Sequence, residues 1–158
     1  RGNIDTATSS WLLFLHADSV LSPRWQDHVR AHMQNHPNQA GYFKFKFDQT
    51  GFWAKYIELW VALRCTLFAL PYGDQGLLIR RDVYESIGGF ADMQLFEDVD
   101  LVRRLGRQRL RVMPACITTS AERYRKHGFV RKGLSNIVLL TRYFLGADVQ
   151  RLMKTYNK

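Results

Sequence analysis

A short apolar run, Trp11–His16, is the feature that most constrains the fold of this chain, and it is followed at once by Ala17 and Asp18. A continuous apolar run of this length, without polar alternation, is typical of a strand covered on both faces in a parallel sheet. In open α/β sheets, ligands bind beyond the carboxyl ends of the strands. The sequence therefore predicts an α/β fold in which Asp18 lies where a ligand binds.

The remaining patterns predict alternating helices and strands within a single domain over residues 1–158. We expect a first helix capped by Ser22, with Pro23 at its first position. The other predicted elements are strands over 41–48, 77–79 and 111–117, and helices over 52–68, after a capping box at Asp82, after Phe96, over 133–145 and after Asp148. The helix over 52–68 is apolar on all sides, so it is either deeply buried or offers an apolar surface to a partner or a membrane.

Charge is unevenly distributed along the chain. Residues 101–158 hold 14 basic and 2 acidic residues, whereas residues 1–100 hold 9 basic and 12 acidic residues. This asymmetry predicts a polyanionic partner, either nucleotide phosphates, nucleic acid or an anionic membrane surface. Nucleic acid is not expected, because no known nucleic-acid-binding motif accompanies the charge.

The two cysteines and the apolar stretches bear on the compartment. Cys65 and Cys116 form neither a disulfide framework nor a metal-ligand spacing, which favours a reduced, cytoplasmic compartment. No basic-then-apolar signal segment opens the chain. The longest apolar stretch, 51–71, is interrupted by three charged residues, which argues against a simple membrane span.

Acidic residues at two places are candidates for chemistry. Asp18 could supply an oxygen ligand to Mg²⁺ or Mn²⁺, which bridges carboxylates and substrate phosphates; alternatively, it caps a turn. Glu97, Asp98 and Asp100 open a predicted helix, where the helix dipole favours acids as caps. A carboxylate there could also accept a proton from a substrate hydroxyl. Asp100 is expected to pair with one of the two arginines that follow it on the same helix.

The loop Gly73-Asp74-Gln75-Gly76 combines two glycines with two short polar side chains. It is compatible with a simple tight turn. It is equally compatible with a binding loop, in which the backbone approaches a ligand closely while Asp74 and Gln75 bind sugar hydroxyls.

Basic residues crowd a second loop, which contains Arg123, Arg125, Lys126 and His127. Cations there could neutralise a diphosphate leaving group, a form of electrostatic stabilisation that often dominates such reactions. A solvated basic face is the alternative interpretation. His127 could complete a metal shell.

The other histidines are expected to be structural or solvated. His16 ends the apolar strand, and we expect a hydrogen-bonded structural residue rather than a base. His28, His32 and His36 recur every four residues on the first predicted helix. No acid or cysteine joins them, so we expect a solvated helix side rather than a metal site.

Three motifs, in this order, give the chain a resemblance to family 2 glycosyltransferases of the GT-A fold. They are Leu13-Phe-Leu-His-Ala-Asp18, Tyr72-Gly-Asp-Gln-Gly-Leu-Leu-Ile-Arg-Arg81 with Ile87-Gly-Gly-Phe90, and Phe96-Glu-Asp-Val-Asp-Leu101. With the ERYRKHG segment at 122–128, the chain is especially similar to a bacterial subgroup of small, uncharacterised transferases. The resemblance covers nearly the whole chain.

The resemblance implies inverting, metal-dependent transfer of a sugar from a nucleotide-diphosphate donor to a hydroxyl of a glycan, lipid or small molecule. The family's Asp-X-Asp element, which binds the metal, falls on His16-Ala17-Asp18, so Asp18 matches the metal ligand and His16 departs from the pattern. The family's Glu-Asp element falls on Glu97 and Asp98, which makes Asp98 the expected base. The Gly73–Gly76 loop matches the region that shapes the donor-sugar and acceptor site. The Gln-X-X-Arg-Trp motif of processive members is absent, which argues against a polysaccharide synthase.

The resemblance also implies that the first part of the domain is missing. Members of the GT-A fold begin with a Val-Ile-Ile-Pro-like strand and further strands that hold the nucleotide base, and none precedes Trp11. The alternative function is therefore a truncated, non-catalytic module that docks on an anionic membrane or a protein. With either function we expect a cytoplasmic protein, with peripheral attachment to the inner membrane as an extension.

Overall fold

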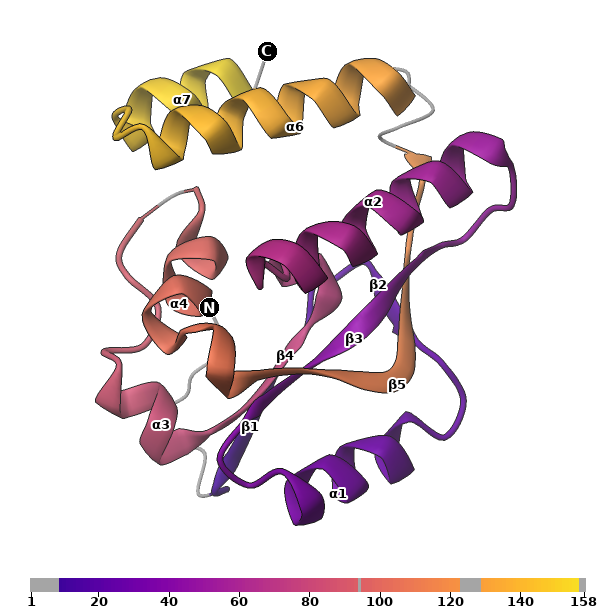
Figure 1. The fold of residues 1–158 in the computed structure, drawn as a ribbon, viewed down its shortest axis with the longest axis vertical. Helices are drawn as coiled ribbons and strands as arrows, with labels where there is room; N and C mark the ends of the chain where they lie inside the picture. Colours follow the sequence, from indigo (N-terminus) through magenta and orange to yellow (C-terminus); the bar gives the residue numbers. More distant parts are fainter. Residues whose placement is uncertain (1–8, 94, 123–128, 157–158) are drawn as a thin grey trace.

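The computed structural model describes residues 9–93, 95–122 and 129–156, which form a mixed α/β structure (Figure 1). The strands are β1 (Trp11–Phe14), β2 (Ser19–Leu21), β3 (Ala40–Phe47), β4 (Leu77–Arg80) and β5 (Leu110–Thr119). The helices are α1 (Trp25–Asn35), α2 (Phe52–Phe68), α3 (Arg81–Ser86), α4 (Glu97–Leu105), α6 (Phe129–Phe144) and α7 (Val149–Tyr156), with short 3-10 turns at Gly73–Gln75 (η1) and Arg107–Arg109 (η2). The predicted α/β class is confirmed.

The strands form one sheet in the order β1-β4-β3-β5-β2. Among the strands that the structure describes, only β3 and β5 run parallel, and the other neighbours are antiparallel. The register between β3 and β5 shifts where Pro114 lies in β5, because proline cannot donate to the ladder. β5 bends strongly along its length, which curls the sheet (Figure 1). The predicted parallel setting of the first strand was wrong, because β1 pairs antiparallel with β4 alone among the described strands.

Both faces of the sheet are nevertheless covered, as the apolar run at β1 predicted. Leu12 faces a cluster that includes Tyr84 of α3 and Leu101 of α4. The next residue, Leu13, points to the opposite face, where it packs on a second buried cluster that Val29 and other residues of α1 also cover. Successive side chains of a strand point to opposite faces. A run without polar alternation therefore indicates that both faces of the strand are buried, and it does not indicate that the neighbouring strand is parallel.

Helix α1 begins later than the sequence predicted. Ser22 does not cap it: its Oγ accepts a hydrogen bond from the Cys116 backbone N–H at 3.1 Å, which prolongs the pairing of β2 with β5. Helix α1 therefore begins at Trp25. His32 is not solvated, since it is buried and its Nε2 bonds the Gln39 carbonyl at 2.8 Å. Burial lowers the pKa of His32.

The last two predicted caps have opposite outcomes. Asp82 does not cap α3, because it lies within the helix and its carboxylate binds the Arg80 side chain and the Val83 N–H. Asp148 does cap α7, since its Oδ1 accepts a hydrogen bond from the Arg151 N–H at 2.9 Å. Within the described residues, no helix is long and apolar enough to cross a bilayer, and both cysteines are free thiols.

Candidate functional site

A cavity of about 730 Å³ lies where several loops and helix ends meet at one end of the sheet. Its wall includes the segment 14–18 after β1, most of the loop 71–76, the start of α4 and two residues of α6, Asn136 and Leu139. The four carboxylates expected to act in binding or catalysis all line it: Asp18, Asp74, Glu97 and Asp98. Asp18 and Asp98, which are far apart in sequence, therefore share one cleft.

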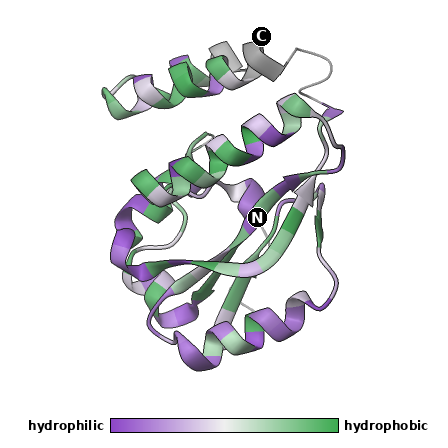
Figure 2. Cartoon of the chain, turned by 45° about the vertical axis from the view of Figure 1, so that its right-hand side comes forward, coloured by the Kyte–Doolittle hydropathy of each residue, from purple (hydrophilic) through white to green (hydrophobic). Residues whose placement is uncertain are grey.

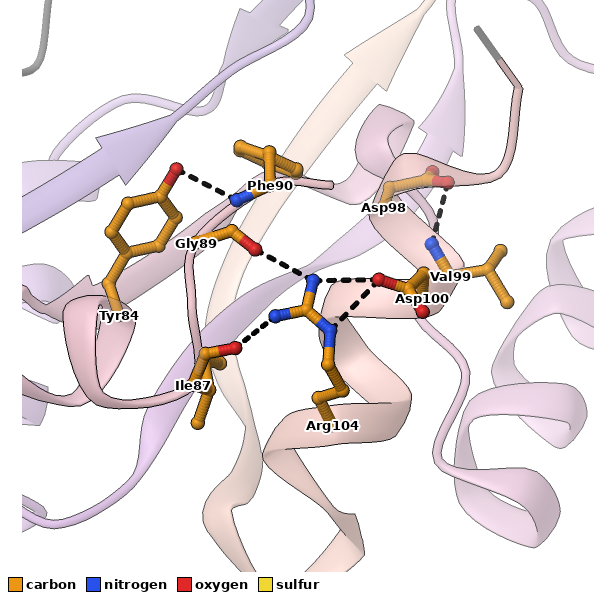
Figure 3. Close-up of polar contacts among 8 residues, drawn as sticks. All are labelled: Tyr84, Ile87, Gly89, Phe90, Asp98, Val99, Asp100 and Arg104. Carbon is orange, nitrogen blue, oxygen red and sulfur yellow. Dashed lines mark hydrogen bonds and ion pairs between the residues drawn. The ribbon is translucent and has the colours of Figure 1, made fainter. Parts of the chain in front are cut away.

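Asp98 joins α4 to the glycine-rich loop. Its Oδ2 accepts a hydrogen bond from the Gly73 N–H at 2.5 Å. Its Oδ1 accepts one from the Val99 N–H at 2.7 Å (Figure 3). Backbone donors on both oxygens fix the orientation of the carboxylate and compensate for its partial burial. A methyl group on Gly73 would lie 3.2 Å from Asp98 Oδ2, a tight contact that would push the carboxylate away from the loop by a few tenths of an ångström.

The start of α4 is held in place by the neighbouring residue Asp100. Its carboxylate pairs with Arg104 at 2.7 Å, as the spacing along the helix predicted. The Arg104 guanidinium also donates to the carbonyls of Ile87 and Gly89, which follow α3 (Figure 3). Asp100 is not part of the cavity wall, and it acts as a positioning residue that fixes α4 against this turn.

Gln75 is buried at 2% exposure and does not line the cavity. Its Nε2 donates to the Phe43 carbonyl at 3.2 Å, and its Oε1 accepts from Arg64 and from the Cys65 thiol, each at 3.1 Å. The side chain is therefore not placed to bind a sugar in the cavity as expected, because its hydrogen bonds connect the loop to β3 and α2. Gly76 follows with a φ of 62°, where Leu15 and Phe43 leave no room for a side chain.

Asp74 is the most strongly perturbed acid of the site. Burial raises its pKa from 3.8 to about 6, and the nearby Asp98 and Asp18 carboxylates act in the same direction, while Arg64 and His16 oppose them. The Oδ1 atom is buried and has no hydrogen-bond partner. An unpartnered carboxylate oxygen in a cavity wall is unfavourable for the isolated chain, and such perturbed groups are concentrated at functional sites.

Asp18 lies at the open side of the cavity, with its side chain 43% exposed. Its Oδ1 contacts His16 Nδ1, so His16 is hydrogen-bonded as expected but half-exposed rather than structural. No three His, Cys, Asp or Glu side chains within the described ranges are close enough to hold a metal ion alone. Mg²⁺ commonly takes only one or two carboxylates and completes its shell with water and substrate phosphates. The donor set here fits a cation of that kind and not a resident, fully ligated ion.

Aromatic residues and α6 complete the wall. Phe96, which precedes α4, adopts a left-handed backbone conformation with a φ of 67°, and its ring packs 4.8 Å from that of Tyr143 on α6. Strained non-glycine residues of this kind cluster at functional sites. Sequence reasoning missed Phe96 and Tyr72 as cavity residues, although each is the first residue of a recognised motif. Nothing in the sequence points to Asn136, because its place depends on how α6 packs.

The basic loop lies outside the described residues. Arg123, Arg125 and His127, which were expected to bind the diphosphate or the metal, are therefore not placed. Helix α6 follows this loop and reaches the cavity through Asn136 and Leu139.

Comparisons with protein-family models, with curated proteins and with solved structures found no match to this chain.

Proposed function

We propose that the protein is an inverting glycosyltransferase that transfers a sugar from a nucleotide-diphosphate donor to an acceptor hydroxyl. The observation that carries this proposal is the meeting of Asp18 and Asp98 in one cavity, beside the Gly73–Gly76 loop. One acid is exposed enough to bind a donor-bound cation, and the other is fixed by backbone N–H groups. The motif order that resembles family 2 glycosyltransferases supports the same assignment, including the GT-A form of the α/β fold.

In this proposal Asp98 is the general base. The acceptor oxygen attacks the anomeric carbon, the bond from that carbon to the diphosphate oxygen breaks, and the hydroxyl proton passes to the Asp98 carboxylate. Attack opposite the leaving group inverts the anomeric centre. The N–H groups of Gly73 and Val99 keep the carboxylate oriented, and a correctly placed base of this type contributes roughly 10²–10⁴-fold to the rate.

The remaining residues act on the donor. Asp18 would hold Mg²⁺ or Mn²⁺, which when bound neutralises charge on the departing diphosphate. Glu97 and the backbone of Gly73 and Gly76 line the cavity beside Asp98, where the sugar and acceptor would bind. Arg123 and Arg125 are proposed to offset charge on the leaving group.

The test compares Asp98→Asn with Asp27→Asn, an exposed change on α1 away from the cavity. Transfer is measured with a panel of nucleotide sugars, and donor binding is measured by titration with and without Mn²⁺. We expect Asp98→Asn to abolish transfer and to leave Mn²⁺-dependent donor binding intact, because the amide cannot take up the proton. Asp27→Asn should change neither. Transfer that survives in Asp98→Asn would remove Asp98 from the mechanism.

A further inference from the structure

Helix α2 presents an unusually apolar surface to solvent. Eight of its large apolar or aromatic side chains are exposed, with Leu59 at 68% and Phe52 at 75%, and all of the eight except Phe68 lie on one side of the helix. The residues on that side form what we call the apolar docking face: Phe52, Trp53, Tyr56, Leu59, Trp60, Leu63 and Leu67. At 3.6 residues per turn they occupy a continuous arc of about 120° that contains no charged residue. The opposite side of the same helix packs on the sheet through Ala54, Ile57, Val61 and Cys65. The sequence predicted either a deeply buried helix or an exposed apolar surface. In the structure, one side of α2 is buried and the other side is exposed.

Helix α6 continues the apolar character next to α2. The two helices contact each other, and most of their length is hydrophobic, unlike that of α1 (Figure 2). Four apolar residues of α6 are exposed, Leu134, Ile137, Val138 and Phe144, as is Leu145 directly after the helix. Single exposed apolar residues are normal, but a contiguous set of this size marks an interaction surface.

The charge of the sequence favours one kind of partner. From residue 123 to residue 147 the sequence contains six Lys or Arg and no Asp or Glu, and the whole chain carries a net charge of +9. Two copies of a chain this basic would therefore repel each other, whereas an anionic bilayer attracts such a chain, by about 1 kcal/mol for each basic residue near the lipid surface. Trp53, Tyr56 and Trp60 combine an apolar ring with a polar group, which is the chemistry enriched at membrane interfaces.

We propose that the apolar docking face of α2, with the exposed apolar residues of α6, binds the surface of an anionic lipid bilayer. The helices would lie in the interface rather than span it: α2 has 17 residues and α6 has 16, fewer than the roughly 20 that a spanning helix needs. The inference does not rest on the proposed sugar transfer. It places the cavity close to the lipid surface, because α6 lines the cavity through Asn136 and Leu139.

The first experiment is flotation of the whole protein with vesicles of phosphatidylcholine alone or mixed with phosphatidylglycerol. We expect binding to the mixed vesicles that is at least about tenfold stronger than to the neutral ones and that weakens in high salt. The double variant Leu59→Ser/Leu63→Ser should lose about tenfold or more of this binding. The matched control is Val20→Ser/Val112→Ser, which removes two exposed apolar side chains from strands β2 and β5 and should bind as the unmodified protein does. Circular dichroism confirms that both variants fold.

A second measurement locates the contact. Brominated lipids in the mixed vesicles should quench the fluorescence of the protein, and Trp53→Phe/Trp60→Phe should remove most of the quenching while binding persists. Absence of binding to the anionic vesicles at low salt would overturn the proposal, as would undiminished binding by Leu59→Ser/Leu63→Ser. A dimer in sedimentation that this double variant abolishes would identify a second copy as the occupant instead and would also overturn it.

Discussion

Replacing Asp74 by asparagine should stabilise the protein, although it removes a charged residue from the centre of the candidate site. Burial raises the pKa of Asp74 from 3.8 to about 6, even though Arg64 acts in the opposite direction. The folded state therefore holds the proton more tightly than the unfolded state. Stability falls as the pH rises from about 4 to about 6, because over this interval the native carboxyl must give up a proton that the unfolded chain has already lost.

The size of the effect follows from the pKa shift. A shift of one pKa unit corresponds to about 1.4 kcal/mol, so a shift from 3.8 to about 6 gives an upper value of about 3 kcal/mol above pH 6. Oδ1 is fully buried, but the residue as a whole is partly exposed, and solvent reduces the effect. We therefore expect Asp74→Asn to raise the free energy of unfolding by about 1–3 kcal/mol at pH 7.5 and by almost nothing at pH 4.

Urea unfolding of both proteins at several pH values between 4 and 8 measures this difference directly. Asp82→Asn is the control, since the Arg80 side chain lowers the pKa of that exposed acid and its loss should not stabilise the fold. If Asp74→Asn is less stable than the unmodified protein at pH 7.5, or if the difference does not depend on pH, the ionised Asp74 carboxylate does not destabilise the folded state as we infer.

Two further substitutions test how the loop is built. Gly73→Ala places a methyl group 3.2 Å from Asp98 Oδ2 and should lower sugar transfer about tenfold or more with little loss of stability. Gly133→Ala, whose new methyl group meets no atom within 4 Å, is the control in the same transfer assay. Equal activity of the two variants would contradict the prediction. Gln75→Leu removes the side-chain amide that donates to the Phe43 carbonyl. It should lower the free energy of unfolding, measured by urea unfolding, by about 1–3 kcal/mol. A change below about 0.5 kcal/mol would show that this hydrogen bond is not stabilising.

Local patterns predicted most elements, and the errors have a common cause. The helix over 52–68 and the strand over 41–48 matched α2 and β3 to within one residue. The start of α1 was wrong, because Ser22 bonds Cys116, which is remote in sequence. The predicted parallel pairing of β1 was wrong for a similar reason. Burial of both faces of a strand does not reveal whether its neighbour runs parallel or antiparallel. In both cases a long-range contact decided between local alternatives.

The site could be predicted only in part. The sequence named Asp18, Asp98 and the Gly73–Gly76 loop, and the structure brings them to one cavity. The burial of the Gln75 side chain was not predictable, because a glycine-rich loop with two polar residues is typical of a tight turn and of a binding loop alike. Nor did any pattern reveal that Asp98 binds the N–H of Gly73, since that contact depends on how α4 docks on the loop.

Two separate features are unfavourable for the isolated chain, and each would be relieved by one of the proposed partners. The Asp74 carboxyl has a buried, unpartnered oxygen and is repelled by the Asp98 and Asp18 carboxylates, a repulsion that a cation bound with its diphosphate would reduce. The exposed face of α2 leaves large apolar side chains in water, and a lipid surface would bury them. Because α6 contacts α2 and also lines the cavity, one helix links the two places. We infer from this that ligand binding in the cavity and docking of α2 are physically adjacent events, so that an acceptor held in a bilayer would reach Asp98 over a short path.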